Sequence, residues 1–138
     1  MAINQLRVLK AGIAAGIVII VSGVAMVPVV GDQMEAALKN RGLPPIGYGA
    51  MLYFALHSLV LGLVIVWLYA ALQARFGQGL RTALVVSALV WFLAYFSANA
   101  AMVAYGFLPL TLTAVGTAWG LVELLLAGIV GARIYGNG

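Results

Sequence analysis

The chain alternates between long apolar runs and short polar segments. Residues 11–30 and 46–72 carry no formal charge, and a third uncharged stretch covers residues 82–122. A single helix over this third stretch would be about 60 Å long, twice the ~30 Å thickness of a hydrocarbon core. We therefore place a helix break at residues 106–109, which contain a glycine and a proline. The pattern predicts four transmembrane helices, at residues 11–30, 46–72, 82–105 and 110–135.

A polar segment, residues 31–45, separates the first two spans. Asp32 and Glu35 have the spacing of a capping box, in which a side chain at each position bonds the backbone of the other. Glu35 and Lys39 form a favourable i,i+4 pair, and Gly42 is suited to end a helix. This spacing predicts a short amphipathic helix in the membrane interface between helices 1 and 2.

The composition agrees with a membrane protein and excludes several other classes. Hydrophobic residues make up 65% of the 138 residues and charged residues only 7%, whereas soluble domains carry about 25% charged residues. The net charge is +4, but the basic residues form no patch, so we expect a lipid bilayer as the partner and no nucleic acid. With no cysteine, one histidine and three acidic residues, we expect no metal site and no cofactor.

The basic residues near the ends of the spans predict the orientation. Five fall on one side and two on the other: Arg7, Lys10, Arg75, Arg81 and Arg133 against Lys39 and Arg41. Both termini are therefore expected in the cytoplasm. Residues 11–30 are longer than the apolar region of a cleaved signal peptide, about 7–15 residues, so we expect this segment to stay as a helix.

These observations combine into one fold class. The sequence predicts an all-α membrane protein in which residues 1–138 form a single domain. It is a bundle of four transmembrane helices with a short extracytoplasmic amphipathic helix between helices 1 and 2.

The last span carries small residues and one carboxylate on a single face. Gly116, Gly120, Glu123, Ala127 and Gly131 are spaced by four, three, four and four residues, which aligns them along a helix. Small residues on one face let a second helix come close. Glu123 is therefore expected to face a neighbouring helix and not lipid.

The first span has a similar packing face. Gly12 and Gly16 form a GxxxG motif. We predict that the helix-packing residues are Gly12, Gly16, Gly116, Gly120 and Gly131.

Glu123 is the first candidate for a functional site, because an ionised carboxylate inside a membrane is costly unless it is paired or hydrated. One interpretation is a proton or cation site that faces a cavity. The other is a neutral carboxyl that joins two helices by a hydrogen bond. Trp119 lies one turn before Glu123, and its indole N–H is expected to reach that carboxyl. Trp91 also lies deep in its span, so an aromatic wall around a cationic ligand is an alternative.

His57 and Asn99 are the remaining candidates, at comparable depth in the second and third spans. We expect a hydrogen bond between helices from His57 to Asn99 or to a nearby serine. A proton relay from His57 to Glu123 through water is an alternative. Axial ligation of haem is a further one, although a single histidine supplies only one axial position.

Several segments of the second half resemble a group of small bacterial four-span inner-membrane proteins of uncharacterised function. The resemblance is carried by the sequence RFGQGLRTA at residues 75–83, by Trp91, by WGLVE at 119–123 and by GARIY at 131–135. It implies four helices in a bacterial inner (cytoplasmic) membrane and carries no activity. Small multidrug-resistance transporters are similar in size and also have one membrane carboxylate. In that family the glutamate lies on the first helix, so the likeness is an analogy only.

No catalytic set emerges from the sequence, because it has neither a phosphate-binding loop nor a plausible Ser–His–acid combination. We therefore expect no enzyme. Two functions stay open. The first is a non-catalytic packing or accessory module that self-associates or joins a membrane complex through its glycine faces. The alternative is an oligomeric transporter or channel, for a small solute or coupled to protons, that uses Glu123.

Overall fold

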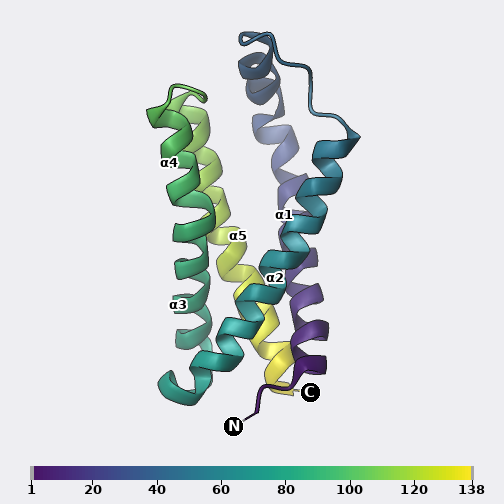
Figure 1. Cartoon of the computed structure of the whole chain (residues 1–138), viewed down its shortest axis with the longest axis vertical. Coiled ribbons are helices and arrows are strands. Elements are labelled where there is room, and N and C mark those ends of the chain that lie inside the picture. Colours follow the sequence, from purple (N-terminus) through teal and green to yellow (C-terminus); the bar gives the residue numbers. More distant parts are fainter. Residues whose placement is uncertain (1, 138) are drawn as a thin grey trace.

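The protein is entirely helical over the residues that the computed structural model describes, residues 2–137 (Figure 1). Helices α3, η1 and α4 follow one another without a break, and η1 is a short π-helix. The elements are α1 Gln5–Lys39, α2 Tyr48–Phe76, α3 Leu80–Trp91, η1 Phe92–Phe96, α4 Ser97–Ala104 and α5 Leu110–Asn137.

Four helices are long and apolar enough to cross a membrane, as the sequence predicts. They are Gln5–Lys39, Tyr48–Phe76, Leu80–Ala104 and Leu110–Gly136. The predicted break near residues 106–109 is a tight turn. Gly106 in this turn has a φ of +73°, which residues other than glycine rarely adopt. Four candidate spans within an all-α fold are therefore confirmed.

The prediction of a separate amphipathic helix after the first span is wrong. Helix α1 continues through this segment to Lys39, with Pro28 inside it. Asp32 caps no helix, because the N-cap of α1 is Asn4, whose Oδ1 accepts from the Arg7 N–H at 3.1 Å. The chain leaves the helix only near Gly42, where φ is +67°. At 35 residues, α1 is about 52 Å long and extends well beyond a ~30 Å hydrocarbon core.

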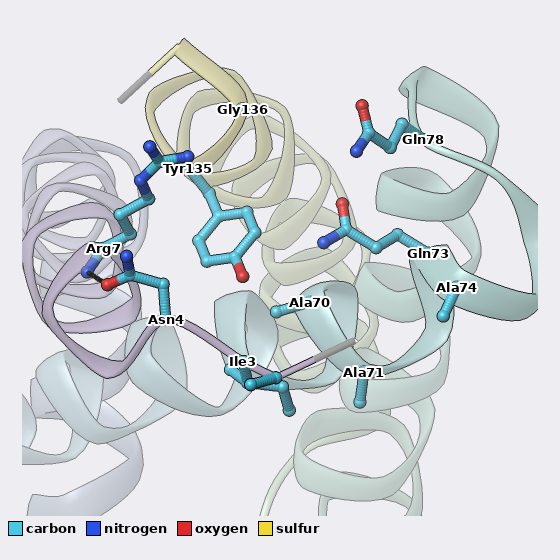
Figure 2. A pocket seen from close by; sticks show the side chains of 11 residues that line it. Ile3, Asn4, Arg7, Ala70, Ala71, Gln73, Ala74, Gln78, Tyr135 and Gly136 are labelled. Atoms are coloured by element: carbon cyan, nitrogen blue, oxygen red, sulfur yellow. Dashed lines mark hydrogen bonds between the residues drawn. The ribbon is translucent and has the colours of Figure 1, made fainter.

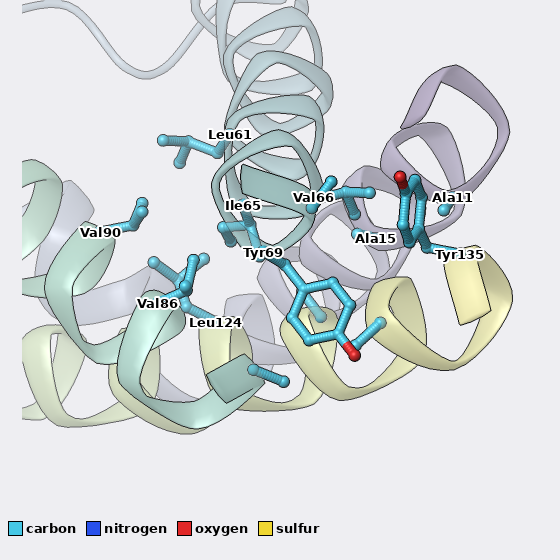
Figure 3. Close-up of a cluster of buried hydrophobic side chains, with 14 of the residues drawn as sticks. Ala11, Ala15, Leu61, Ile65, Val66, Tyr69, Val86, Val90, Leu124 and Tyr135 are labelled. Atoms are coloured by element: carbon cyan, nitrogen blue, oxygen red, sulfur yellow. The ribbon is translucent and has the colours of Figure 1, made fainter. Parts of the chain in front are cut away.

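The helices form a bundle in which both termini lie at one end, here called the termini end (Figure 1). Helix α1 packs against α2 and α5, and α3 packs against the same two helices, so α1 and α3 lie diagonally opposite each other. A cluster of buried apolar side chains lies between the helices in the half toward the termini end (Figure 3). Its fully buried members include Ile19, Ile65, Val66, Val86 and Leu124.

Glycines of α1 and α2 bring the backbones of these two helices together. A methyl group at Gly62 would collide with the carbonyl oxygen of Gly12 and with the backbone of Gly16. A methyl group at Gly16 would lie 2.7 Å from the Cα of Leu59. The two backbones therefore touch, and only glycine fits at the crossing point.

Replacing Gly62 with alanine tests this contact. We expect the substitution to destabilise the bundle by about 3 kcal/mol, because the added methyl group meets backbone atoms that cannot rotate away. The loss is measured by unfolding in mixed micelles with increasing dodecyl sulfate. Gly49→Ala is the matched control, since nothing lies within 4 Å of a methyl group at that position of the same helix. Equal stability of the two variants would contradict the backbone contact.

Candidate functional site

Glu123 lies inside the bundle and accepts a hydrogen bond from another element. Its residue surface is only 4% exposed. The Tyr95 hydroxyl of η1 donates to Oε1 of Glu123 at 2.8 Å. Ser22 of α1 lies beside the same carboxyl. Glu123 therefore joins α5 to η1 and faces α1.

Trp119 joins this cluster indirectly. Its indole Nε1 donates to Oγ of Ser22 at 2.9 Å. The expectation that Trp119 donates to Glu123 itself is therefore wrong. The indole bonds across the interface to α1, and Ser22 stands between the two side chains. We call Glu123, Tyr95, Ser22 and Trp119 the carboxyl network.

The π-helix η1 positions Tyr95 within this network. A π-helix accommodates one extra residue per turn and changes the direction of the side chains that follow, and such segments are frequent at functional sites. The Tyr95 ring lies over Gly120, where a methyl group would come within 3.2 Å of the ring carbon Cδ1. Gly120 thus leaves room for the ring, so that its hydroxyl reaches Glu123 one turn further along α5.

The carboxyl network contains one group that can gain or lose a proton. An ionised Glu123 accepts from the Tyr95 hydroxyl, while the Trp119 indole donates to Ser22. A neutral Glu123 carries a hydrogen of its own and keeps one carbonyl oxygen as an acceptor. If the neutral carboxyl donates to Tyr95, the Tyr95 hydrogen must turn to another acceptor. Protonation in that arrangement changes the contact with η1.

The ligands that the network offers are few. It presents one carboxylate and two hydroxyl oxygens, whereas Ca²⁺ takes about six to eight oxygen ligands. No group of three or more His, Asp or Glu that could hold a metal lies within residues 2–137. A carboxyl group with hydroxyl neighbours can bind a proton and form hydrogen bonds.

Trp91 and Asn99 meet at Thr117 on α5, away from Glu123. The indole of Trp91 donates to the Thr117 carbonyl at 2.8 Å, and the Asn99 amide donates to Thr117 Oγ1 at 2.8 Å. Thr117 in turn donates to the carbonyl of Thr113 in its own helix, at 2.7 Å. These bonds fasten the helix Leu80–Ala104 to α5.

The predicted hydrogen bond between His57 and Asn99 or a serine is absent. Within residues 2–137 His57 makes no hydrogen bond, and its ring stacks on Tyr53 with centroids 5.6 Å apart. The backbones of α2 and α4 do not approach each other, because α4 packs against α5 and η1 alone. His57 and Asn99 are therefore at comparable depth in the membrane but lie on helices that do not contact each other.

The glycines that the sequence indicates for helix packing differ in how tightly they are packed. Gly12 and Gly16 lie against α2, and Gly131 lies against Val66 of α2. Gly120 faces Tyr95. Gly116 is looser, because only the Met26 methyl carbon comes near, 3.6 Å from the position of an added methyl group.

Sequence reasoning missed Tyr95, Ser22 and Thr117 as members of the site. Tyr95 lies in the middle of its span, whereas membrane tyrosines are enriched near the headgroups. This unusual depth was the available signal. Ser22 and Thr117 carried none, because serine and threonine in a membrane helix commonly bond to their own backbone.

No protein-family model, no curated protein and no solved structure matches the chain. The resemblance to small four-span inner-membrane proteins therefore stays a prediction.

Tyr95→Phe tests the carboxyl network. The variant removes the hydroxyl donor from Glu123 and keeps the ring over Gly120. We expect a loss of about 1–3 kcal/mol in unfolding free energy and a shift of the Glu123 carboxyl band in infrared spectra. Tyr105→Phe is the control, because Tyr105 is 75% exposed and lies beyond the network. Unchanged stability and an unchanged band would contradict the assigned hydrogen bond.

Proposed function

We propose that the chain is a non-catalytic membrane module that self-associates or joins a larger membrane complex. The observation that carries the proposal is His57. It lies nine residues after the start of α2, about 14 Å along the helix, and makes no hydrogen bond within residues 2–137. A polar ring at that depth needs a partner, because lipid offers none. A second polypeptide would supply it.

The surroundings of His57 support the same proposal. Tyr53, on which the ring stacks, is 68% exposed, and no residue of η1 or α4 is buried. The first half of α2 and the whole of α4 therefore have free faces at the end opposite to the termini. We call them the far faces.

The glycine motifs do not support assembly in the way that the sequence suggests. Gly12, Gly16 and Gly131 are covered by neighbouring helices of the same chain. They join α1, α2 and α5 to one another and leave no glycine face of this kind for a partner. The proposed assembly therefore uses the far faces instead.

The proposed setting is a bacterial inner membrane with both termini in the cytoplasm. The positive-inside rule supports this orientation, because five basic residues belong to the termini end and two to the other. The termini and the α2–α3 connector lie together at that end (Figure 1).

His57→Leu tests the assembly. An interhelical hydrogen bond in a membrane contributes about 0.6–2 kcal/mol, so we expect dissociation to increase about 3- to 30-fold. Energy transfer between donor- and acceptor-labelled copies in vesicles, at increasing lipid dilution, measures self-association. Co-purification from the native membrane measures binding to another protein.

The matched control for this test is Val21→Leu. Val21 lies on α1, away from the far faces, and is 62% exposed. Assembly should be retained in this variant. Assembly that is equally strong in His57→Leu and wild type would refute the role of His57.

A second function is supported by the carboxyl network: an oligomeric transporter or channel for a small solute or coupled to protons. Glu123 is buried, accepts from Tyr95 of the π-helix and lies beside Ser22 of α1. Protonation that changes these contacts is what coupling of a proton to helix movement requires.

Glu123→Gln distinguishes the two functions. The amide keeps the size and hydrogen-bonding ability of a neutral carboxyl but cannot exchange a proton. For the packing module we expect assembly to survive. For the transporter we expect proton flux into vesicles, followed with a pH-sensitive dye, to fall at least tenfold. Proton flux that persists at the wild-type rate in Glu123→Gln would exclude Glu123 as the coupling group.

A further inference from the structure

A cavity of about 350 Å³ opens at the termini end, between the start of α1, the end of α2 and the end of α5 (Figure 2). Its volume is within the range of small-ligand sites, about 300–1,000 Å³. Alanines of α2 form part of its wall, and the polar residues around it are Asn4, Arg7, Gln73, Gln78 and Tyr135. It lies apart from the carboxyl network and from the far faces.

Tyr135 is the feature that indicates a ligand. Only 7% of the residue is exposed, and no hydrogen bond joins its hydroxyl to residues 2–136. Figure 2 shows the ring between the Asn4–Arg7 segment and Gln73, with the hydroxyl directed toward Ala70. The hydroxyl is not closed off from the cavity, because the one enclosed side-chain atom without a partner among the described residues is Ser87 Oγ. It can therefore donate to a group bound there.

The charge around the cavity favours an anion. Arg7 lines it, and forms no ion pair with any residue from 2 to 137. The termini end also carries four other basic residues, Lys10, Arg75, Arg81 and Arg133. The three acidic residues of the sequence, Asp32, Glu35 and Glu123, do not line the cavity. The first turn of α1 contributes partial positive charge, whereas the last turns of α2 and α5, which also line the cavity, contribute partial negative charge. The attraction for an anion therefore comes from the Arg7 guanidinium, and no acidic side chain lines the cavity.

The depth of the cavity matches the headgroup layer. Arg7 lies four residues before the uncharged run that starts at residue 11, which is about 6 Å along the helix. The headgroup region of a bilayer is about 5–8 Å thick on each side. The polar side of the cavity is therefore level with lipid phosphates.

We propose that this cavity binds a phosphate group, supplied by the headgroup of an anionic phospholipid or by a free phosphate. The Arg7 guanidinium contacts the phosphate oxygens through a charge-assisted hydrogen bond, and the Tyr135 hydroxyl and the Gln73 amide donate to them. Basic pockets between helices at the membrane surface are suited to such headgroups.

The test measures binding of three probes to the full chain in detergent by native mass spectrometry. The probes are dioctanoyl-phosphatidylglycerol, dioctanoyl-phosphatidylcholine and inorganic phosphate. The variants are Arg7→Gln, which removes the charge, and Tyr135→Phe, which removes only the hydroxyl. Lys10→Gln is the control, because it removes a charge at the same end but does not line the cavity. Thermal unfolding verifies that each variant is folded.

We expect phosphatidylglycerol to bind wild type at least tenfold more tightly than phosphatidylcholine. Arg7→Gln should weaken this binding about tenfold and Tyr135→Phe about threefold, while Lys10→Gln leaves it unchanged. The same pattern with inorganic phosphate at equal affinity would support the site and identify free phosphate as the ligand. Equal losses in Arg7→Gln and Lys10→Gln would indicate diffuse surface attraction and overturn the proposal. An unchanged affinity in folded Tyr135→Phe would overturn it too.

Discussion

The contact between the backbones of α1 and α2 at Gly12, Gly16 and Gly62 is the constraint on which the rest of the structure depends. In a membrane, helix association gains little from the hydrophobic effect, because lipid tails are as apolar as the side chains. Dense packing and interhelical hydrogen bonds replace it. The glycine contact supplies the packing between α1 and α2, and the hydrogen bond from Trp119 to Ser22 joins α5 to α1.

The two ends of the bundle are packed differently. Toward the termini end, α1 and α5 bury small residues such as Ala11, Ala15 and Ala127. At the opposite end η1 and α4 bury no residue, and α4 is held to α5 through the bond from Asn99 to Thr117. Close packing of small residues holds the half at the termini end together, and a few hydrogen bonds hold the other half. Rearrangement therefore costs least at the far faces, where few contacts have to break.

The sequence predicted the parts of this fold that depend on composition. Four apolar runs must form helices in a membrane, since every backbone group needs a partner there. It did not predict that α1 continues to Lys39, because Gly31 and Asp32 are typical of a helix boundary, yet helical hydrogen bonds persist through them. Nor did it predict Tyr95 beside Glu123, because a π-helix changes the direction of side chains without a sequence signal. Glu123 itself was identified, since a carboxylate inside an apolar run is conspicuous.

The same hydrogen bonds would have different roles in the two proposed functions. In a packing module the carboxyl network stays in one state and holds α1, η1 and α5 together. In a transporter the network must have two states of similar free energy, because an equilibrium shifts only if a ligand or proton favours one of them. The second state would be one in which a protonated Glu123 donates to Tyr95 and the Tyr95 hydrogen turns to another acceptor. A water molecule entering from the far faces, where contacts are sparse, would be such an acceptor, and this would link access at that end to protonation at the centre.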